Sequence, residues 1–246
     1  MTIISGADAL NELNRSDDGG GNTQEFAPFK SGTTYTVKVL GTTDLISFYS
    51  YGIFKQVNSF VAKNPSKKSR NGFPIENLTP WDKAWKYHAD RSKKFGDKHS
   101  QEAYKYKPRQ RFAMGFIDLD TGDPIIVDLS KNQAQAVHSS IMKYKERLDQ
   151  FAFELSKTGQ GTNTTVSLSL IPILDDLTDE QRKNFENAPK ESDMSLLDGI
   201  LYEMDEEEQI EKLIEVGFDV SLIGLEKPEN SEEENTNADD DDDLPF

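Results

Sequence analysis

The sequence contains no cysteine and only three histidines among its 246 residues. Without cysteine the chain cannot form disulfides, thiolate zinc sites or iron–sulfur clusters, and it has no cysteine nucleophile. It also lacks the GxxxxGK loop that binds phosphates and the GxSxG turn of serine hydrolases. A metal site built from His88, His99, Asp90 and Asp97 is an alternative, but these residues lie among lysines. We therefore expect a protein that is not an enzyme and that uses no metal or other cofactor.

Long apolar runs are absent as well. No stretch approaches the roughly 18 apolar residues of a membrane-spanning helix, and residues 1–14 lack the basic and apolar regions of a secretory signal. Hydrophobic residues make up 35% of the chain and charged residues 29%, so we expect a packed core with part of the chain outside it. Together with the absence of cysteine, this favours a cytoplasmic protein with no membrane partner.

The net charge of −16 is distributed unequally along the chain. Residues 1–173 carry 23 basic and 18 acidic side chains, whereas residues 174–246 carry 5 basic and 26 acidic ones. Within the first part, residues 55–111 hold 15 basic and 5 acidic residues. This asymmetry predicts an anionic partner for the basic stretch and an interaction tail at the acidic end. Ordinary surface lysines and a solubilising tail would give the same composition.

Alternation of apolar and polar residues predicts the strands. A hairpin is expected where two such segments flank the turn Thr121-Gly122-Asp123-Pro124, because these residue types favour turns. The strands are predicted at residues 33–39, 45–54, 57–62, 111–120, 125–130 and 164–173.

Three segments carry helical signals. Thr79 suits the N-cap of a helix that we expect to end near Gly96. Ser130 begins a capping box, and apolar residues three and four apart follow it. This stripe predicts one helix of about seven turns that ends near Gly159. Residues 204–218 form the third predicted helix.

This order of elements favours a mainly β protein with helices, namely an OB-fold-like small barrel with a basic insert and one long packed helix. A flat sheet with one helix fits the same order. We expect an N-terminal arm, an OB-like core that contains the insert, an acidic helical region, and a disordered acidic tail that cannot bury enough apolar surface to fold. The predicted boundaries are 1–27, 28–175 with the insert at 63–110, 176–227 and 228–246.

Cations and aromatic residues alternate through residues 63–111. Binding of single-stranded nucleic acid requires cations along the phosphate backbone and aromatic faces for the bases, and aromatic residues of the second predicted strand can line the same groove. The alternative is that many of these aromatic rings are core residues, and Trp81 and Trp85 could equally seat their helix on the barrel. The predicted DNA-binding residues are Tyr49, Tyr51, Lys55, Lys67, Lys68, Arg70, Trp81, Trp85, Lys93, Lys94, Tyr104, Lys105, Tyr106, Lys107, Arg109 and Arg111.

The sequence ends in DDDDDLPF. A partner can place the Phe246 ring in an apolar pocket, hold its carboxylate with a basic residue and attract the aspartates by long-range charge. This end resembles the C-terminal tip of bacterial single-stranded DNA-binding proteins, which recruits replication, recombination and repair proteins. The predicted partner-binding residues are Asp239, Asp240, Asp241, Asp242, Asp243, Leu244, Pro245 and Phe246.

Residues 28–186 resemble the single-stranded DNA-binding protein family of T-even bacteriophages in the order of their predicted elements and in local composition. The resemblance rests on the basic and aromatic insert, the aromatic strand at 111–116, an acidic turn, a strand that leads into a long helix, and the Ile-Pro and Asp-Asp pairs within 171–176. It implies an OB-fold and a viral protein that acts in the cytoplasm of a bacterial host. Two features differ: the family's insert holds zinc through cysteines and a histidine, and its N-terminal arm carries a basic motif where residues 1–25 have only Arg15.

The leading hypothesis is a single-stranded DNA-binding protein of DNA replication, recombination and repair, which protects DNA without reading its sequence. The first alternative is an adaptor that engages host replication proteins through the tip. A strand-annealing or recombination protein is the second, and an enzyme is the most distant. The sequence predicts no oligomeric state, and the preference for DNA over RNA comes from the resemblance alone.

Overall fold

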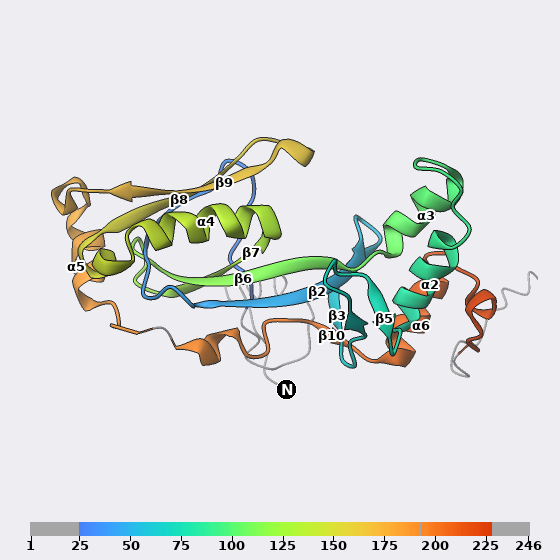
Figure 1. Ribbon diagram of the computed structural model, residues 1–246. Helices are drawn as coiled ribbons and strands as arrows, with labels where there is room; N and C mark the ends of the chain where they lie inside the picture. Colours follow the sequence, from blue (N-terminus) through green and yellow to red (C-terminus); the bar gives the residue numbers. More distant parts are fainter. Residues whose placement is uncertain (1–24, 192, 228–246) are drawn as a thin grey trace, which may run out of the picture. The chain divides into compact units, whose positions relative to one another are not determined.

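Figure 1 shows the computed structural model of the chain, which describes residues 25–191 and 193–227. Most of the predicted N-terminal arm, the whole acidic tail and its tip therefore lie outside the described residues. None of the helices within these two ranges combines the length and apolar character that crossing a membrane requires.

In chain order the elements are β1 (Thr34–Lys38), β2 (Leu45–Ile53), β3 (Val57–Ala62), β4 (Lys67–Lys68), β5 (Pro74–Glu76), α2 (Pro80–Ala89), α3 (Lys98–Tyr106), β6 (Arg109–Asp118), β7 (Pro124–Ser130), α4 (Lys131–Lys143), β8 (Ala152–Thr158), β9 (Thr165–Ile171), α5 (Asp179–Asn187), β10 (Glu203–Met204) and α6 (Glu206–Glu215), with short 3-10 turns between some of them.

The chain forms two compact units, and each unit is assembled from two separate stretches of sequence. Within the described residues, the first unit comprises 25–46 and 112–200, and the second comprises 47–111 and 201–227. The predicted boundaries differ from this division. The basic insert lies wholly inside the second unit, while the predicted acidic helical region is divided between the two units.

The first unit contains a mostly antiparallel sheet with the strand order β7-β6-β1-β8-β9. β1 lies antiparallel between β6 and β8, and β8 is antiparallel to β9. The end strands β7 and β9 are not paired with each other, so the sheet of this unit does not close into a barrel. The fold is thus mixed α/β with an open sheet, and the predicted OB-fold-like small barrel is not confirmed.

The predicted seven-turn helix is also wrong, because the chain leaves the α-helix after Lys143 and the last residues of the predicted helix form strand β8. Helix α4 ends at Lys143, and Arg147 in the following 3-10 turn has non-helical backbone angles. In β8 the buried Phe153 and Leu155 alternate with the exposed Glu154. β8 is hydrogen-bonded on both sides, to β1 and to β9, and this non-local pairing overrides a local pattern that fits a helix.

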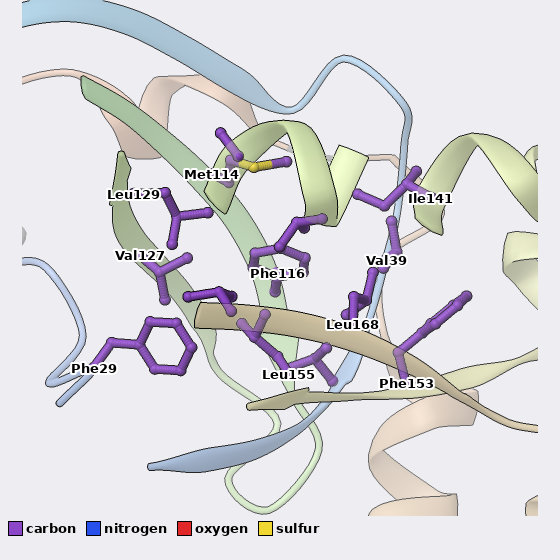
Figure 2. Packing of buried hydrophobic residues seen from close by; sticks show 14 of the residues in the cluster. Phe29, Val39, Met114, Phe116, Val127, Leu129, Ile141, Phe153, Leu155 and Leu168 are labelled. Atoms are coloured by element: carbon purple, nitrogen blue, oxygen red, sulfur yellow. The ribbon is translucent and has the colours of Figure 1, made fainter. Parts of the chain in front are cut away.

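The core of the first unit lies between α4 and the sheet, and α4 packs against β7 and β9. Figure 2 shows Val39, Phe116, Leu155 and Leu168 pointing toward one another in this core. Phe116, Leu155 and Leu168 lie on β6, β8 and β9, and Val39 directly follows β1. At another part of the unit, Phe185 of α5 packs with residues from β6 and β8.

The second unit places helices beside a small group of strands. β3 pairs antiparallel with β2 and parallel with the short β10, and β4 pairs antiparallel with β5. Helix α2 packs against α3 and α6, so both sequence stretches of the unit meet at α2. The predicted strands at 45–54, 57–62 and 164–173, the hairpin and the helix at 204–218 are confirmed in outline by β2, β3, β9, the β6–β7 pair and α6.

The substitution Phe153→Ala distinguishes the observed strand from the predicted helix. In a helix, Phe153 would lie on the face opposite the apolar stripe, and its truncation would change stability by no more than about 0.5 kcal/mol. In β8 its side chain is fully buried, so we expect a loss of about 3–5 kcal/mol in the free energy of unfolding. Urea unfolding followed by far-UV circular dichroism measures this, with exposed Glu154→Ala as the near-neutral control; equal effects would contradict the strand.

Candidate nucleic-acid interface

Helix α2 begins where the sequence predicts. Thr79 is its N-cap, with Oγ1 accepting a hydrogen bond from the Asp82 amide at 3.1 Å, and Pro80 occupies the first helical position. The helix ends at Ala89 rather than near Gly96. A second helix, α3, follows it, and no sequence pattern had been assigned to it.

The signal for α3 is a capping residue within the basic stretch. The Asp97 carboxylate accepts hydrogen bonds from the backbone amides of Ser100, Lys93 and Lys94. These bonds stabilise the charged form, so they hold the pKa of Asp97 well below its usual range. The spacing of Asp97 and Ser100 is typical of a helix start, and it would have identified α3 in the sequence.

A buried carboxylate joins α2 to two strands. Asp82 is fully buried, and it accepts hydrogen bonds from the Tyr51 hydroxyl at 2.9 Å, from the Lys68 ammonium at 3.1 Å and from the Ser66 hydroxyl. Burial lowers the pKa of Lys68, while the charge of Asp82 opposes that shift. Burial first and Asp82 second raise the pKa of Tyr51 far above its usual range. This network, the Asp82 network, connects β2 and β4 to α2.

Trp81 lies in the core of the second unit, not at its surface. Its side chain is fully buried, and its ring contacts those of Tyr51, Phe60 and Tyr106. The indole Nε1 donates a hydrogen bond to the backbone oxygen of Gln209 in α6 at 3.1 Å. α2 and α6 are thereby held together through a buried donor that has its partner.

Four of the predicted DNA-binding residues therefore need correction. A ring that is buried against other rings has no exposed face on which a base can stack. An ammonium that already donates hydrogen bonds to a buried carboxylate is not available to bind a phosphate. The four residues are Trp81, Tyr51, Tyr106 and Lys68.

The other twelve predicted residues remain accessible to different degrees. Two of the cations already have acidic neighbours, since Lys67 lies 3.0 Å from Glu76 and Lys105 lies 2.8 Å from Glu102. Surface ion pairs of this kind contribute about 0–1 kcal/mol, so a phosphate can replace either carboxylate. The exposed residues are Lys55, Lys67, Arg70, Lys93, Lys94, Tyr104, Lys105 and Arg109, and the half-buried ones are Tyr49, Trp85, Lys107 and Arg111.

Phe73 and Trp85 form the centre of an accessible aromatic surface. Their rings are stacked, with centroids 5.6 Å apart and planes 18° apart, and the Lys107 ammonium lies 5.1 Å from the Phe73 centroid. Gly72 has a φ of +79°, and a Cβ at this position would lie 3.1 Å from the Tyr49 hydroxyl. The β4–β5 turn can therefore rest against Tyr49 only with glycine there. We call Tyr49, Phe73, Trp85 and Lys107 the Phe73 platform.

Other aromatic rings of the basic stretch also have a cation nearby. The Arg91 guanidinium lies 3.6 Å from the Tyr87 centroid, and Arg109 lies 5.4 Å from that of Tyr104. These distances are within the range of cation–π attraction. The exposed surface of the unit thus combines positive charge with aromatic faces.

The predicted set leaves out three exposed phenylalanines, although all three lie within the aromatic and basic pattern. Phe54 is 85% exposed and Phe95 is fully exposed, and Phe73 is the third. For two of them the signal is an adjacent cation, because Lys55 follows Phe54 and Lys94 precedes Phe95. Apolar rings next to charges in a turn are poor candidates for a core.

The residues of the alternative metal site do not assemble. His88 and His99 approach with their Nδ1 atoms 3.0 Å apart, but Asp90 pairs with Lys86 and Asp97 caps α3. In the part of the chain that the structure describes, no three histidine or acidic side chains come together in a way that could hold a metal ion. The histidine pair instead connects α2 to α3.

No protein-family model matches this sequence, and no curated protein matches it either.

The Asp82 network predicts a large effect from a nearly isosteric change. Asp82→Asn leaves the Lys68 ammonium buried without its counter-charge, so we expect a loss of about 3–5 kcal/mol in the stability of the second unit. Both tryptophans of the chain, Trp81 and Trp85, lie in this unit, so urea unfolding followed by tryptophan fluorescence reports on it. The control, Glu76→Gln, breaks an exposed ion pair and should cost about 0–1 kcal/mol; similar losses in both variants would refute the role of the network.

The second unit should also lose stability in mild acid. Burial lowers the pKa of His88 from its ordinary value near 6.5. Just below that pH, the His88 imidazole therefore binds a proton more readily in the unfolded chain than in the folded one. Stability is therefore highest above pH 6.5 and falls as the pH drops below it. We expect His88→Phe to flatten the dependence of the urea midpoint on pH between about 7.5 and 5.5. An unaltered slope in His88→Phe would contradict this origin.

Proposed function

We propose that this chain is a sequence-tolerant single-stranded DNA-binding protein that acts in DNA replication, recombination and repair, and that its second unit holds the DNA. The observation that carries the proposal is the coincidence of exposed aromatic rings with positive charge in residues 47–111. This stretch has 15 basic and 5 acidic residues. It also holds Phe54, Phe73, Phe95 and Tyr104, whose exposed fractions run from 40% to 100%.

Exposed apolar surface that gathers in one region marks candidate binding sites, whereas single exposed rings are ordinary. Among the described residues, every large aromatic side chain that is mostly exposed lies in the second unit, and Tyr202 is the one outside the basic stretch. Bases stack on such rings whatever their identity, and cations follow the phosphate backbone. A protein that bound single strands by charge and stacking would therefore read little sequence.

The resemblance to the phage family supports DNA over RNA and a role in a bacterial cytoplasm. The proposal does not require an OB barrel, because all accessible candidate residues belong to the second unit. Recruitment of replication, recombination and repair proteins through Asp239–Phe246 remains a prediction, since the tip lies outside the described residues. The adaptor hypothesis uses the same tip, with the body contacting protein or RNA, but an adaptor does not require the basic and aromatic insert.

Phe73→Leu tests the proposal at the Phe73 platform. The change keeps an apolar side chain but removes the ring, so the loss of one stacked base should weaken binding of oligo-dT by roughly 5- to 150-fold, which corresponds to about 1–3 kcal/mol. Fluorescence anisotropy of labelled oligo-dT at several salt concentrations measures the affinity. For the wild type, the affinity should fall as salt rises, because each phosphate contact contributes about 0.7 to the logarithmic slope.

Tyr202→Leu is the matched control. Tyr202 is 57% exposed and belongs to the same unit, but it lies in the acidic stretch, so its loss should leave the affinity unchanged. If the wild-type chain fails to bind oligo-dT at low salt, the proposal is wrong and the adaptor hypothesis takes its place. If both variants bind as tightly as the wild type, the interface is misplaced.

A further inference from the structure

The first unit has an apolar cavity that the DNA-binding proposal does not use. Its volume is about 160 Å³, and an apolar cavity of roughly 150 Å³ is large enough to bind benzene. The cavity therefore has room for one phenyl ring. Its wall includes four buried apolar side chains, those of Phe116, Ile117, Ile126 and Leu197.

A glycine in the interior of strand β6 also lines this cavity. A Cβ at Gly115 would meet no atom within 4 Å, so the space beside it is empty. Gly115 does not have the positive φ that glycine adopts more readily than other residues. Glycine inside a strand often stands where a ligand or another backbone approaches closely, and this observation points to an occupant of the cavity.

The exposed side of the cavity is acidic. Asp44, Glu191 and Asp193 line it, and among the described lining residues there is no lysine, arginine or histidine. Glu191 and Asp193 are exposed. The hydroxyl and the backbone amide of Ser195 donate to the Asp193 carboxylate at 2.6 and 3.0 Å, and these bonds hold its pKa below the ordinary value. An apolar cavity beside carboxylates suits an apolar side chain whose neighbours are cations.

The chain presents such a side chain in the loop between α2 and α3. Phe95 is fully exposed, and the exposed Lys93 and Lys94 precede it. We call residues 91–97 the Phe95 loop. A ring in this state contributes nothing to the packing of its own unit, in contrast to Phe73, which stacks on Trp85.

Hydrogen bonds fix the conformation of the Phe95 loop. The Asp97 carboxylate accepts from the backbone amides of Lys93 and Lys94 at 2.7 and 3.1 Å. The Gly96 amide donates to the Ser100 hydroxyl oxygen at 3.2 Å. Because the loop is already ordered, docking of its exposed ring requires little further loss of conformational entropy.

The charge of the cavity distinguishes between possible occupants. Phe246 follows five aspartates, so its approach would be opposed by like charge, and so would that of a nucleotide with its phosphate. Phe95 combines a phenyl ring with two adjacent ammonium groups. We infer that the chain associates with itself, and that the Phe95 loop of one copy docks in this cavity of a second copy. Lys93 and Lys94 then face the carboxylates.

This inference does not rest on the DNA-binding proposal. It assigns the Phe95 loop to a second copy and leaves the Phe73 platform to DNA. Every copy carries both the loop and the cavity, so each can provide either half of the contact.

Sedimentation velocity of the full-length protein without DNA tests the inference. At about 0.15 M salt the Debye length is about 8 Å, so the long-range repulsion between copies of net charge −16 is largely screened. A contact made by one loop is small and therefore weak. We expect the weight-average sedimentation coefficient of the wild type to rise by about 1.3-fold or more between about 10 and 300 µM protein.

Variants assign the association to the two halves of the contact. Phe95→Ser removes the ring, and Glu191→Lys reverses a charge at the cavity. Each variant alone should lose the dependence on concentration. Phe54→Ser is the matched control, because Phe54 is 85% exposed in the same unit as Phe95 and Lys55 follows it. This control should associate like the wild type.

A mixture of the two variants shows whether the ring and the cavity belong to different copies. The Glu191→Lys protein retains Phe95, and the Phe95→Ser protein retains the acidic cavity. The mixture should therefore regain a sedimentation coefficient that rises with concentration, although neither variant shows this alone.

Several outcomes would overturn the inference. They are a constant sedimentation coefficient of the wild type, an equal loss in Phe54→Ser, no loss in Glu191→Lys, and no recovery in the mixture. If the wild type stays monomeric while a Lys-Lys-Phe-Gly peptide shifts the backbone amides of Gly115 and Ile126 in nuclear magnetic resonance spectra, the occupant is a partner protein and not a second copy. The oligo-dT titration of Phe73→Leu involves none of these residues, so failure of either proposal leaves the other intact.

Discussion

One buried carboxylate, that of Asp82, determines how the second unit is arranged. A charge in the interior must be compensated by hydrogen bonds and an opposite charge, and here Tyr51, Ser66 and Lys68 supply them. Because these partners come from β2, from β4 and from the residue before it, α2 can occupy one position only. Its position directs one tryptophan into the core and leaves the next accessible beside Phe73.

The second unit also combines two stretches of opposite charge. Residues 47–111 are strongly basic and residues 201–227 are strongly acidic, yet they share one core in which Trp81 donates a hydrogen bond to α6. The basic stretch carries most of the exposed aromatic rings, and the acidic stretch contributes apolar side chains of α6 to the shared core.

Sequence patterns predict structure correctly where neighbouring residues determine the conformation. They fail where pairing with a distant segment determines it. The cap at Thr79, the capping box at Ser130 and the alternation of β2 and β3 were read correctly because each depends on neighbouring residues. The segment of strand β8 is predicted as helix because Leu155 fits both the helical and the strand periodicity. Its pairing with β1 and β9 involves residues distant in the sequence, so the local pattern does not reveal it. The OB-fold-like barrel is not confirmed for the same reason, since the closure of a sheet depends on which of its end strands pair.

By itself the sequence determined the charge of each stretch, the absence of thiol chemistry, most strand positions and the richness of residues 63–111 in cations and rings. Only the tertiary structure decided which rings are accessible. Trp81 and Trp85 are four residues apart and share a helix face, so their spacing could not separate them. Trp81 is buried because its ring meets three others and its Nε1 reaches α6, whereas Trp85 meets Phe73 and stays half exposed. Burial depends on what packs against a side chain, and for Trp81 one of these neighbours, Gln209 of α6, is more than a hundred residues away in the sequence.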